Sequence, residues 1–335
     1  MRWTRPSRSM IVNLVLVLTA FGLLGAAIAS KWDTIRDVLS RPIDRGAFGA
    51  AFGLYLLGLL LTFTRWYILV RTLQIPFRPI DALRLGFVGN VFNLVIPGAV
   101  GGDVIKAVFL ARARPDRKAA SIASMVIDRL LGLAGLFLLA GIAGVFAFGR
   151  APSQARILIV TTWVALVCGL IGLAVIFTPK LYPFLERFTS GKPKLAHLLH
   201  ELERAASSYR DRIGVVVGCL LFSTLIHSIY VVAFYLASRA IFESIPSFSE
   251  HLLMVPLVLF TTAVPLPFGA LGLTENASGV MFQLVGHPDG AVAMMAFRVL
   301  MYAGGVVSSL VYLANFRQIR DLRTQEAPAP APLEL

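Results

Sequence analysis

Long apolar stretches dominate the hydrophobic pattern of the chain. A membrane-spanning helix needs about 20 predominantly apolar residues, and six stretches meet this requirement: 10–29, 46–64, 119–148, 157–177, 213–238 and 291–313. Two further apolar regions, 81–112 and 252–286, are interrupted by Pro-Gly clusters that break a helix. We expect each of them to form a re-entrant hairpin, which returns to the side it left. The pattern predicts an all-α polytopic membrane protein with six full spanning helices and two re-entrant broken hairpins.

The composition excludes a soluble enzyme and a disordered chain. Hydrophobic residues make up 57% of the 335 residues and charged residues only 15%, with a mean hydropathy of +0.77, whereas an ordinary soluble domain has about 25% charged residues. The one sizeable polar insertion, 178–212, carries leucines at helical spacing and predicts a cytoplasmic amphipathic linker. The Ala-Pro steps of 324–335 predict a disordered tail, which leaves 1–323 as a single transmembrane domain.

The net charge of +13 would suggest nucleic acid as the partner of a soluble protein. Lys and Arg also collect in the cytoplasmic loops of membrane proteins. With the N-terminus and the C-terminus inside, the predicted cytoplasmic loops hold 20 Lys or Arg and the external loops hold seven. The positive-inside rule therefore accounts for the charge, and we expect a multi-pass protein of the cell (inner or plasma) membrane with no nucleic-acid partner.

The two broken regions share one order of features. Each has a proline and several glycines, then a carboxylate, and then a long apolar segment with one arginine. The first set is Pro97, Gly98, Gly101, Gly102, Asp103 and Arg129, and the second is Pro267, Gly269, Gly272, Glu275 and Arg298. This order predicts inverted repeats at approximately 46–148 and 213–313. In transporters with broken helices and inverted repeats, the substrate site lies at the repeat interface.

Six ionisable groups are expected at membrane depth, three of each sign: Asp103, Lys106, Asp128, Arg129, Glu275 and Arg298. Each costs about 2.5–3.5 kcal/mol on insertion scales unless it faces a partner or a wet cavity. One interpretation is a self-neutralising salt-bridge network that holds the bundle together. The other is a cavity in which Arg129, Arg298, Lys106 and Asn93 bind a lipid headgroup, while Asp103, Asp128 and Glu275 form a charge network or carry a proton. Asn93 is equally suited to bonding backbone freed by the breaks.

No nucleophile elbow, nucleotide-binding loop or metal-ligand spacing occurs in the sequence. We therefore expect no cofactor, no metal and no catalytic residue, so that the protein is not an enzyme. A membrane transferase that uses one of the buried carboxylates as a base is a weaker alternative, because no metal or nucleotide signature accompanies them.

Three segments resemble the lysylphosphatidylglycerol synthase transmembrane region family, whose members are also described as flippase-like integral membrane proteins. They are PGAVGGDVIKAVFLAR at 97–112, ASIASMVIDRLLGLAGL at 119–135 and PFGALGLTENA at 267–277. The likeness extends over roughly 10–315. In full-length synthases a soluble aminoacyl transferase domain follows the membrane region. We expect this chain to lack it, so the resemblance implies the flippase-like half alone.

The resemblance and the intramembrane charges together favour a flippase-like transporter. Its expected substrate is an amphipathic, anionic lipid (a phospholipid, a hopanoid or a polyprenyl-linked glycan) that it moves between membrane leaflets. The alternative is a non-transporting membrane partner of a lipid-modifying or glycan-assembling enzyme. The oligomeric state is not indicated by the sequence.

Overall fold

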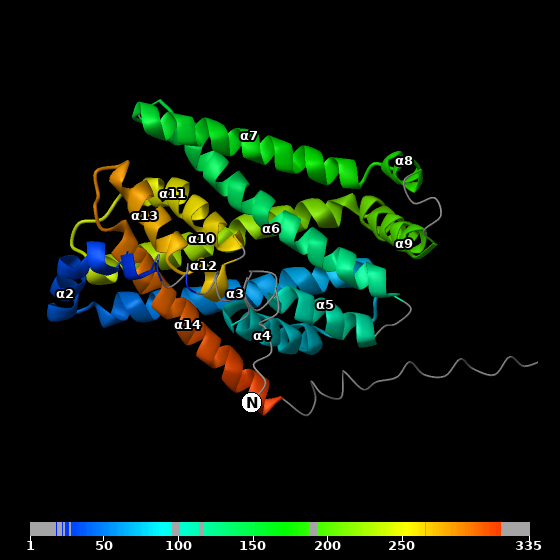
Figure 1. Cartoon of the computed structure of the whole chain (residues 1–335), viewed down its shortest axis with the longest axis horizontal. Helices are drawn as coiled ribbons and strands as arrows, with labels where there is room; N and C mark the ends of the chain where they lie inside the picture. Colours follow the sequence, from blue (N-terminus) through cyan, green and yellow to red (C-terminus); the bar gives the residue numbers. More distant parts are fainter. Residues whose placement is uncertain are drawn as a thin grey trace, which may run out of the picture.

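The computed structural model describes residues 18, 22, 24–26, 28–95, 101–113, 117–149, 151–187, 193–264 and 266–315. Throughout these residues the regular structure is helical and contains no strand, which confirms the predicted all-α membrane fold. Figure 1 shows long helices that run along the longest axis of the molecule or cross it obliquely, with shorter helices between them and at both ends.

Five long helices match predicted spans. They are α3 (Arg45–Thr72), α6 (Lys118–Ala147), α7 (Ser153–Ile176), α10 (Ile213–Ile241) and α14 (Gly290–Ala314), all of them long and apolar enough to cross a membrane. In four of them the ends differ from the expected ends by a few residues, and α3 extends further, to Thr72. At 1.5 Å per residue the lengths of the five helices are about 36–45 Å, which exceeds the roughly 30 Å of hydrocarbon. The predicted span 10–29 lies almost wholly outside the described residues.

Both interrupted regions form pairs of shorter helices. The first pair is α4 (Pro79–Val95) and α5 (Gly101–Ala113). Gly102 near the start of α5 donates its N–H to Asn93 near the end of α4 at 2.8 Å, and Lys106, one turn later in α5, lies against Gly89, one turn earlier in α4, so the pair is antiparallel. A β-carbon on Gly102 would overlap the backbone of Gly89, so glycine is required where the two helices approach. Pro97 and Gly98 lie outside the described residues, and Gly101 begins α5.

The second pair is α11 (Phe248–Phe260) and α13 (Leu273–Gln283), joined through η2 (Thr261–Ala263) and α12 (Pro267–Ala270). The ring of His251 in α11 lies 5.3 Å from that of Phe282 in α13, so this pair is antiparallel as well. Gly269 and Gly272 have φ angles of 66° and 81°, the left-handed region that glycine adopts without strain.

The two halves meet along α3 and α10, which run antiparallel to each other. Asp44, just before α3, donates its N–H to Ala240 near the end of α10 at 3.0 Å. At the other end of the contact, Arg212 just before α10 donates to the carbonyl of Thr72 at 3.2 Å. α4 packs on α14 of the other half, and α11 packs on α6, so the halves exchange equivalent helices. The two hairpins consequently lie toward opposite ends of the bundle in Figure 1.

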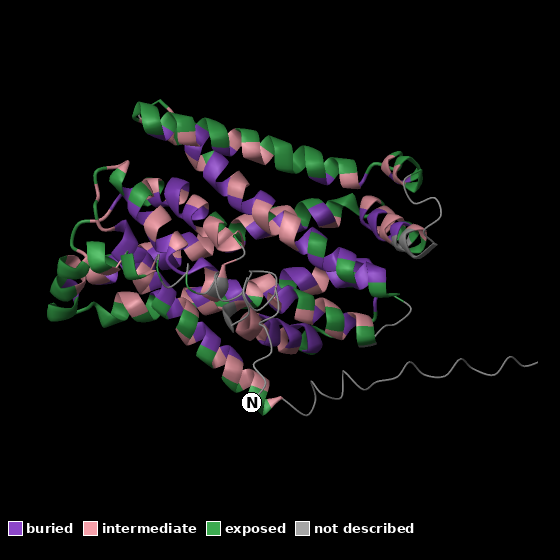
Figure 2. Ribbon diagram, viewed as in Figure 1, coloured by how far each residue is buried: buried purple, intermediate pink, exposed green. Residues whose placement is uncertain are grey.

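The outer surface of the bundle is apolar. α7, which packs on α6 along one edge of the molecule (Figure 2), exposes the side chains of Ile157, Val160, Val164, Val167, Leu170, Ile171 and Val175. A continuous apolar face of this kind is unfavourable in water and suits hydrocarbon.

Three further helices lie outside the spans. α2 (Trp32–Ser40) occupies the predicted external loop 30–45, and α8 (Leu181–Glu186) and α9 (Pro193–Arg210) occupy the polar insertion. α9 packs on α6. The hydroxyl of its Tyr209 donates to the carbonyl of Leu69 at 3.0 Å, and burial raises the pKa of Tyr209, so the donor stays protonated.

Candidate functional site at the interface of the two halves

A cavity of about 270 Å³ lies between the two halves of the bundle. Residues of α3, α4, α5 and α6 line it from the first half, and residues of α10, α11, η2 and α14 line it from the second. Its walls combine apolar side chains such as Leu59, Phe63 and Met301 with five charged ones: Arg65, Asp103, Lys106, Asp128 and Arg129. The structure thus brings together four of the predicted charged residues, and Asn93 also lines the cavity.

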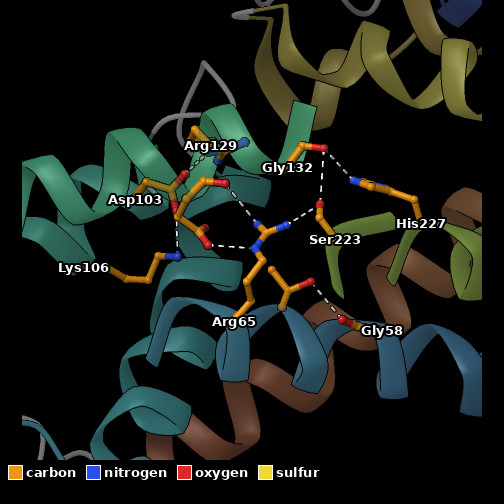
Figure 3. Close-up of polar contacts among 10 residues, drawn as sticks. Gly58, Arg65, Asp103, Lys106, Arg129, Gly132, Ser223 and His227 are labelled. Atoms are coloured by element: carbon orange, nitrogen blue, oxygen red, sulfur yellow. Dashed lines mark hydrogen bonds and ion pairs between the residues drawn. The ribbon is translucent and has the colours of Figure 1, made fainter. Parts of the chain in front are cut away.

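Asp103 is the centre of a three-residue cluster (Figure 3). It lies in the first turn of α5 and accepts from Lys106 Nζ at 2.7 Å and from Arg129 Nε. The ammonium of Lys106 also lies 5.0 Å from the centre of the Trp66 ring, a favourable cation–π distance. The side chains of Lys106 and Asp103 are each 7% exposed, whereas that of Arg129 is 40% exposed. One carboxylate therefore faces two cations, and the cluster carries one excess positive charge.

Arg65 is the charged residue that the sequence analysis missed. The predicted span 46–64 ends directly before Arg65 and leaves it in the following loop, but α3 continues to Thr72 and carries Arg65 into the cavity wall. Its Nε pairs with Asp128 Oδ1 at 2.9 Å, its Nη1 donates to Ser223 Oγ at 2.7 Å, and its Nη2 donates to the carbonyl of Asp128 at 3.2 Å (Figure 3). The apolar run Trp66–Val70 was the available signal, because it continues the span beyond the charge.

This placement corrects the expected charge balance. Adding Arg65 to the six groups expected from the sequence gives four cations and three carboxylates in that set, which therefore does not sum to zero. The excess of one positive charge arises at the cavity, where Arg65 and Asp128 neutralise each other and the Asp103 cluster retains its second cation.

The second buried arginine lies elsewhere. Arg298 pairs through Nε with Glu275, and its Nη1 donates to the carbonyls of Phe268 at 2.8 Å and Gly269 at 3.2 Å. The side chains of Arg298 and Glu275 are 4% and 0% exposed, and neither lines the cavity. One interpretation of the sequence placed Arg298 and Arg129 around the same headgroup. The structure does not bring the two arginines together around one cavity.

The two halves differ where they would otherwise correspond. The offset of 169 residues that aligns Arg129 with Arg298 aligns Arg65 with Phe234 and Asp128 with Phe297. The rings of these two phenylalanines lie 5.3 Å apart, so an aromatic contact in the second half replaces an ion pair in the first. The charged residues of the cavity lining therefore all come from the first half.

Comparison with known proteins identifies the family. The profile of the family described as the lysylphosphatidylglycerol synthase TM region matches residues 10–309. The chain belongs to this family. No curated protein and no solved structure matches it significantly. Family membership, together with the apolar helices, shows a multi-pass membrane protein of lipid metabolism or transport.

The matched region of this lysylphosphatidylglycerol synthase TM family member includes both hairpins and all five charged residues of the cavity. Amides close to the hairpin breaks satisfy backbone groups. Asn93 accepts from Gly102 at 2.8 Å, and Asn276 donates to the carbonyl of Gly272 at 2.7 Å. His227 Nε2 lies 3.0 Å from the carbonyl of Gly132 and links α10 to α6. Within the described residues, no group of three or more potential metal ligands occurs.

Proposed function

We propose that the protein moves an anionic, amphipathic lipid from one leaflet of the cell membrane to the other, with both of its termini in the cytoplasm. The observation that carries this proposal is the charged cavity at the interface of two halves whose hairpins lie toward opposite ends of the bundle. The excess positive charge of the Asp103 cluster favours a headgroup with a negative charge, such as a phosphodiester.

The position of the cavity suits the physical barrier to lipid exchange. A headgroup has to cross about 30 Å of hydrocarbon. Arg129 is 11 residues after the first residue of α6, which places it about 16 Å along that helix. Arg129 and Phe260, both in the cavity lining, have exposed side-chain surface. A headgroup held there has polar partners near mid-depth while the lipid tails remain in the bilayer.

Within the cavity, the two ion pairs have different roles in this proposal. All three nitrogens of the Arg65 guanidinium have acceptors in the protein, so the Arg65–Asp128 pair holds the wall. Arg129 and Lys106 share one carboxylate, and a lipid phosphate competes with Asp103 for them. Arginine supplies a planar fork that matches phosphate. This mode of transport requires no catalytic residue.

Reconstituted vesicles that contain labelled lipids test the proposal. The wild-type protein is expected to exchange an anionic phospholipid between leaflets, and Arg129→Gln is expected to abolish the exchange. Arg156→Gln is the matched control, since Arg156 lies outside the cavity and stacks on Phe148. Exchange by neither wild type nor control would favour a non-transporting partner of an enzyme, and conversion of the lipid into a new product would favour a transferase.

A further inference from the structure

The connection between α12 and α13 contains an unfavourable backbone. Phe268, Gly269 and Ala270 have φ angles of 56°, 66° and 55°, so three consecutive residues adopt the left-handed conformation. Only glycine adopts it without penalty, and for other residues it reduces the population by a factor of about 5–30. Such outliers persist where surrounding contacts hold them, and they cluster at switch regions and ligand clamps.

One buried ion pair holds this turn. Arg298 Nη1 donates to the carbonyls of Phe268 and Gly269, while its Nε pairs with Glu275. Glu275 Oε2 in turn accepts the N–H of Gly272 at 2.7 Å. The carboxylate and the guanidinium thus fix the backbone on both sides of Ala270, and both are almost fully removed from solvent.

The turn also adjoins the cavity. η2, just before it, contributes Thr262 and Ala263 to the lining. α12 packs on α4 of the other half, so the turn lies where the second hairpin meets the first half. A β-carbon on Gly269 would lie 3.7 Å from Met301 Cε, and Met301 is another lining residue. A displacement of the turn would therefore alter the cavity wall.

We propose that Arg298 is a positioning residue that holds the left-handed turn 268–270 as a closed gate between the second hairpin and the cavity. When the Arg298–Glu275 pair separates, the turn relaxes to a favourable conformation, and this relief of strain offsets part of the loss of the ion pair. The gate equilibrium is a property of the hairpin, and its consequence for transport rests on the proposed function.

The decisive variant is Ala270→Gly, which removes the part of the penalty that arises at Ala270 and deletes only one methyl group. Because the closed state alone gains, the open state is expected to become about fivefold less populated. Gln74→Gly is the matched control. Gln74 has a φ of 58° but is exposed at the end of α3, away from the gate. Both variants should fold, with melting temperatures no lower than that of the wild type.

The gate is measured by thiol labelling of Thr274→Cys in a background that carries Cys168→Ser and Cys219→Ala. Thr274 is 0% exposed and bonds to the carbonyl of Ala270, so position 274 becomes reactive only when the turn opens. We expect Ala270→Gly to slow labelling about fivefold and Gln74→Gly to leave it unchanged. Arg298→Lys, which keeps the charge but loses the fork that reaches the two carbonyls, should accelerate labelling.

Transport measured on the same variants separates this proposal from the proposed function. Slower labelling and slower lipid exchange in Ala270→Gly support both the gate and the proposed transport function. Slower labelling in vesicles whose wild-type protein exchanges no lipid supports the gate and refutes transport. If Ala270→Gly labels at the same rate as Gln74→Gly, or if Thr274→Cys never labels, the turn is a fixed structural element and the gate proposal is wrong.

Discussion

The Arg65–Asp128 ion pair allows a quantitative test of how the cavity wall is held. Its two side chains are each 6% exposed and are joined at 2.9 Å. Removing one partner of such a pair leaves an unpaired buried charge and costs about 3–5 kcal/mol. Replacing both by apolar residues of similar volume is often neutral or stabilising. The second half of the chain already accommodates an apolar pair at the corresponding place, Phe234 with Phe297.

We therefore expect a non-additive double-mutant cycle. Arg65→Met and Asp128→Leu should each lower the melting temperature by on the order of 10 °C. The double variant should recover most of that loss, so the coupling amounts to several kcal/mol. The assay is thermal unfolding in one detergent, with the four proteins purified in parallel. The double variant should also retain lipid exchange, because the headgroup is assigned to Arg129 and Lys106.

Two results would refute this reasoning. If the double variant melts at the sum of the two single losses, then Arg65 and Asp128 are not coupled, and the wall depends on other contacts such as the bond from Arg65 to Ser223. If the double variant is stable but exchanges no lipid, then Arg65 or Asp128 takes part in binding and the division of roles in the cavity is wrong.

Three further predictions concern the hairpin, the orientation and the arginines. Gly102→Ala should prevent α4 and α5 from closing and lower the yield of folded protein, measured by size-exclusion chromatography. Asp211 and Pro288 are exposed on opposite sides of the bundle. A cysteine label at 211 should react only from the cytoplasm and one at 288 only from outside, and a label at 288 reached from the cytoplasm would overturn the orientation. Arg129→Lys should reduce the anionic lipid that co-purifies, whereas Arg298→Lys should leave it unchanged; equal losses would contradict the assigned roles.

The sequence predicted the helices well because the bilayer imposes one length and one polarity on every span. The expected and observed bounds of the last span, 291–313 and Gly290–Ala314, differ by one residue at each end. The two Pro-Gly interruptions were equally informative, since a helix cannot continue through them and a hairpin is the remaining way to satisfy the backbone. The carboxylate and the arginine that follow each interruption pair in the structure, Asp103 with Arg129 and Glu275 with Arg298, although the order of features did not specify these pairs.

The site was harder to predict, because hydropathy records how apolar a segment is and not which way a side chain points. Arg65 ended the apolar window and was read as the start of a loop, although helix α3 continues past it. Arg298 and Arg129 each follow a Pro-Gly interruption and a carboxylate in the sequence. Arg298 donates to two backbone carbonyls, whereas the side chain of Arg129 is 40% exposed. The packing of the second hairpin against α4 and α14 encloses Arg298, whose side chain is 4% exposed.

The difference between the two arginines follows from what each carboxylate has to neutralise. Asp103 serves two cations, and the side chain of Arg129 is 40% exposed to the cavity. Glu275 serves Arg298 and the N–H of Gly272, and Arg298 donates from Nη1 to the carbonyls of the left-handed turn. The two carboxylate–arginine pairs thus differ in their surroundings: the first belongs to the cluster with the excess positive charge, and the second bonds to the backbone of the turn. A lipid phosphate displaces a carboxylate from an arginine more readily than it displaces fixed backbone carbonyls in a dry site. A headgroup is therefore expected to bind at the pair of Asp103 and Arg129.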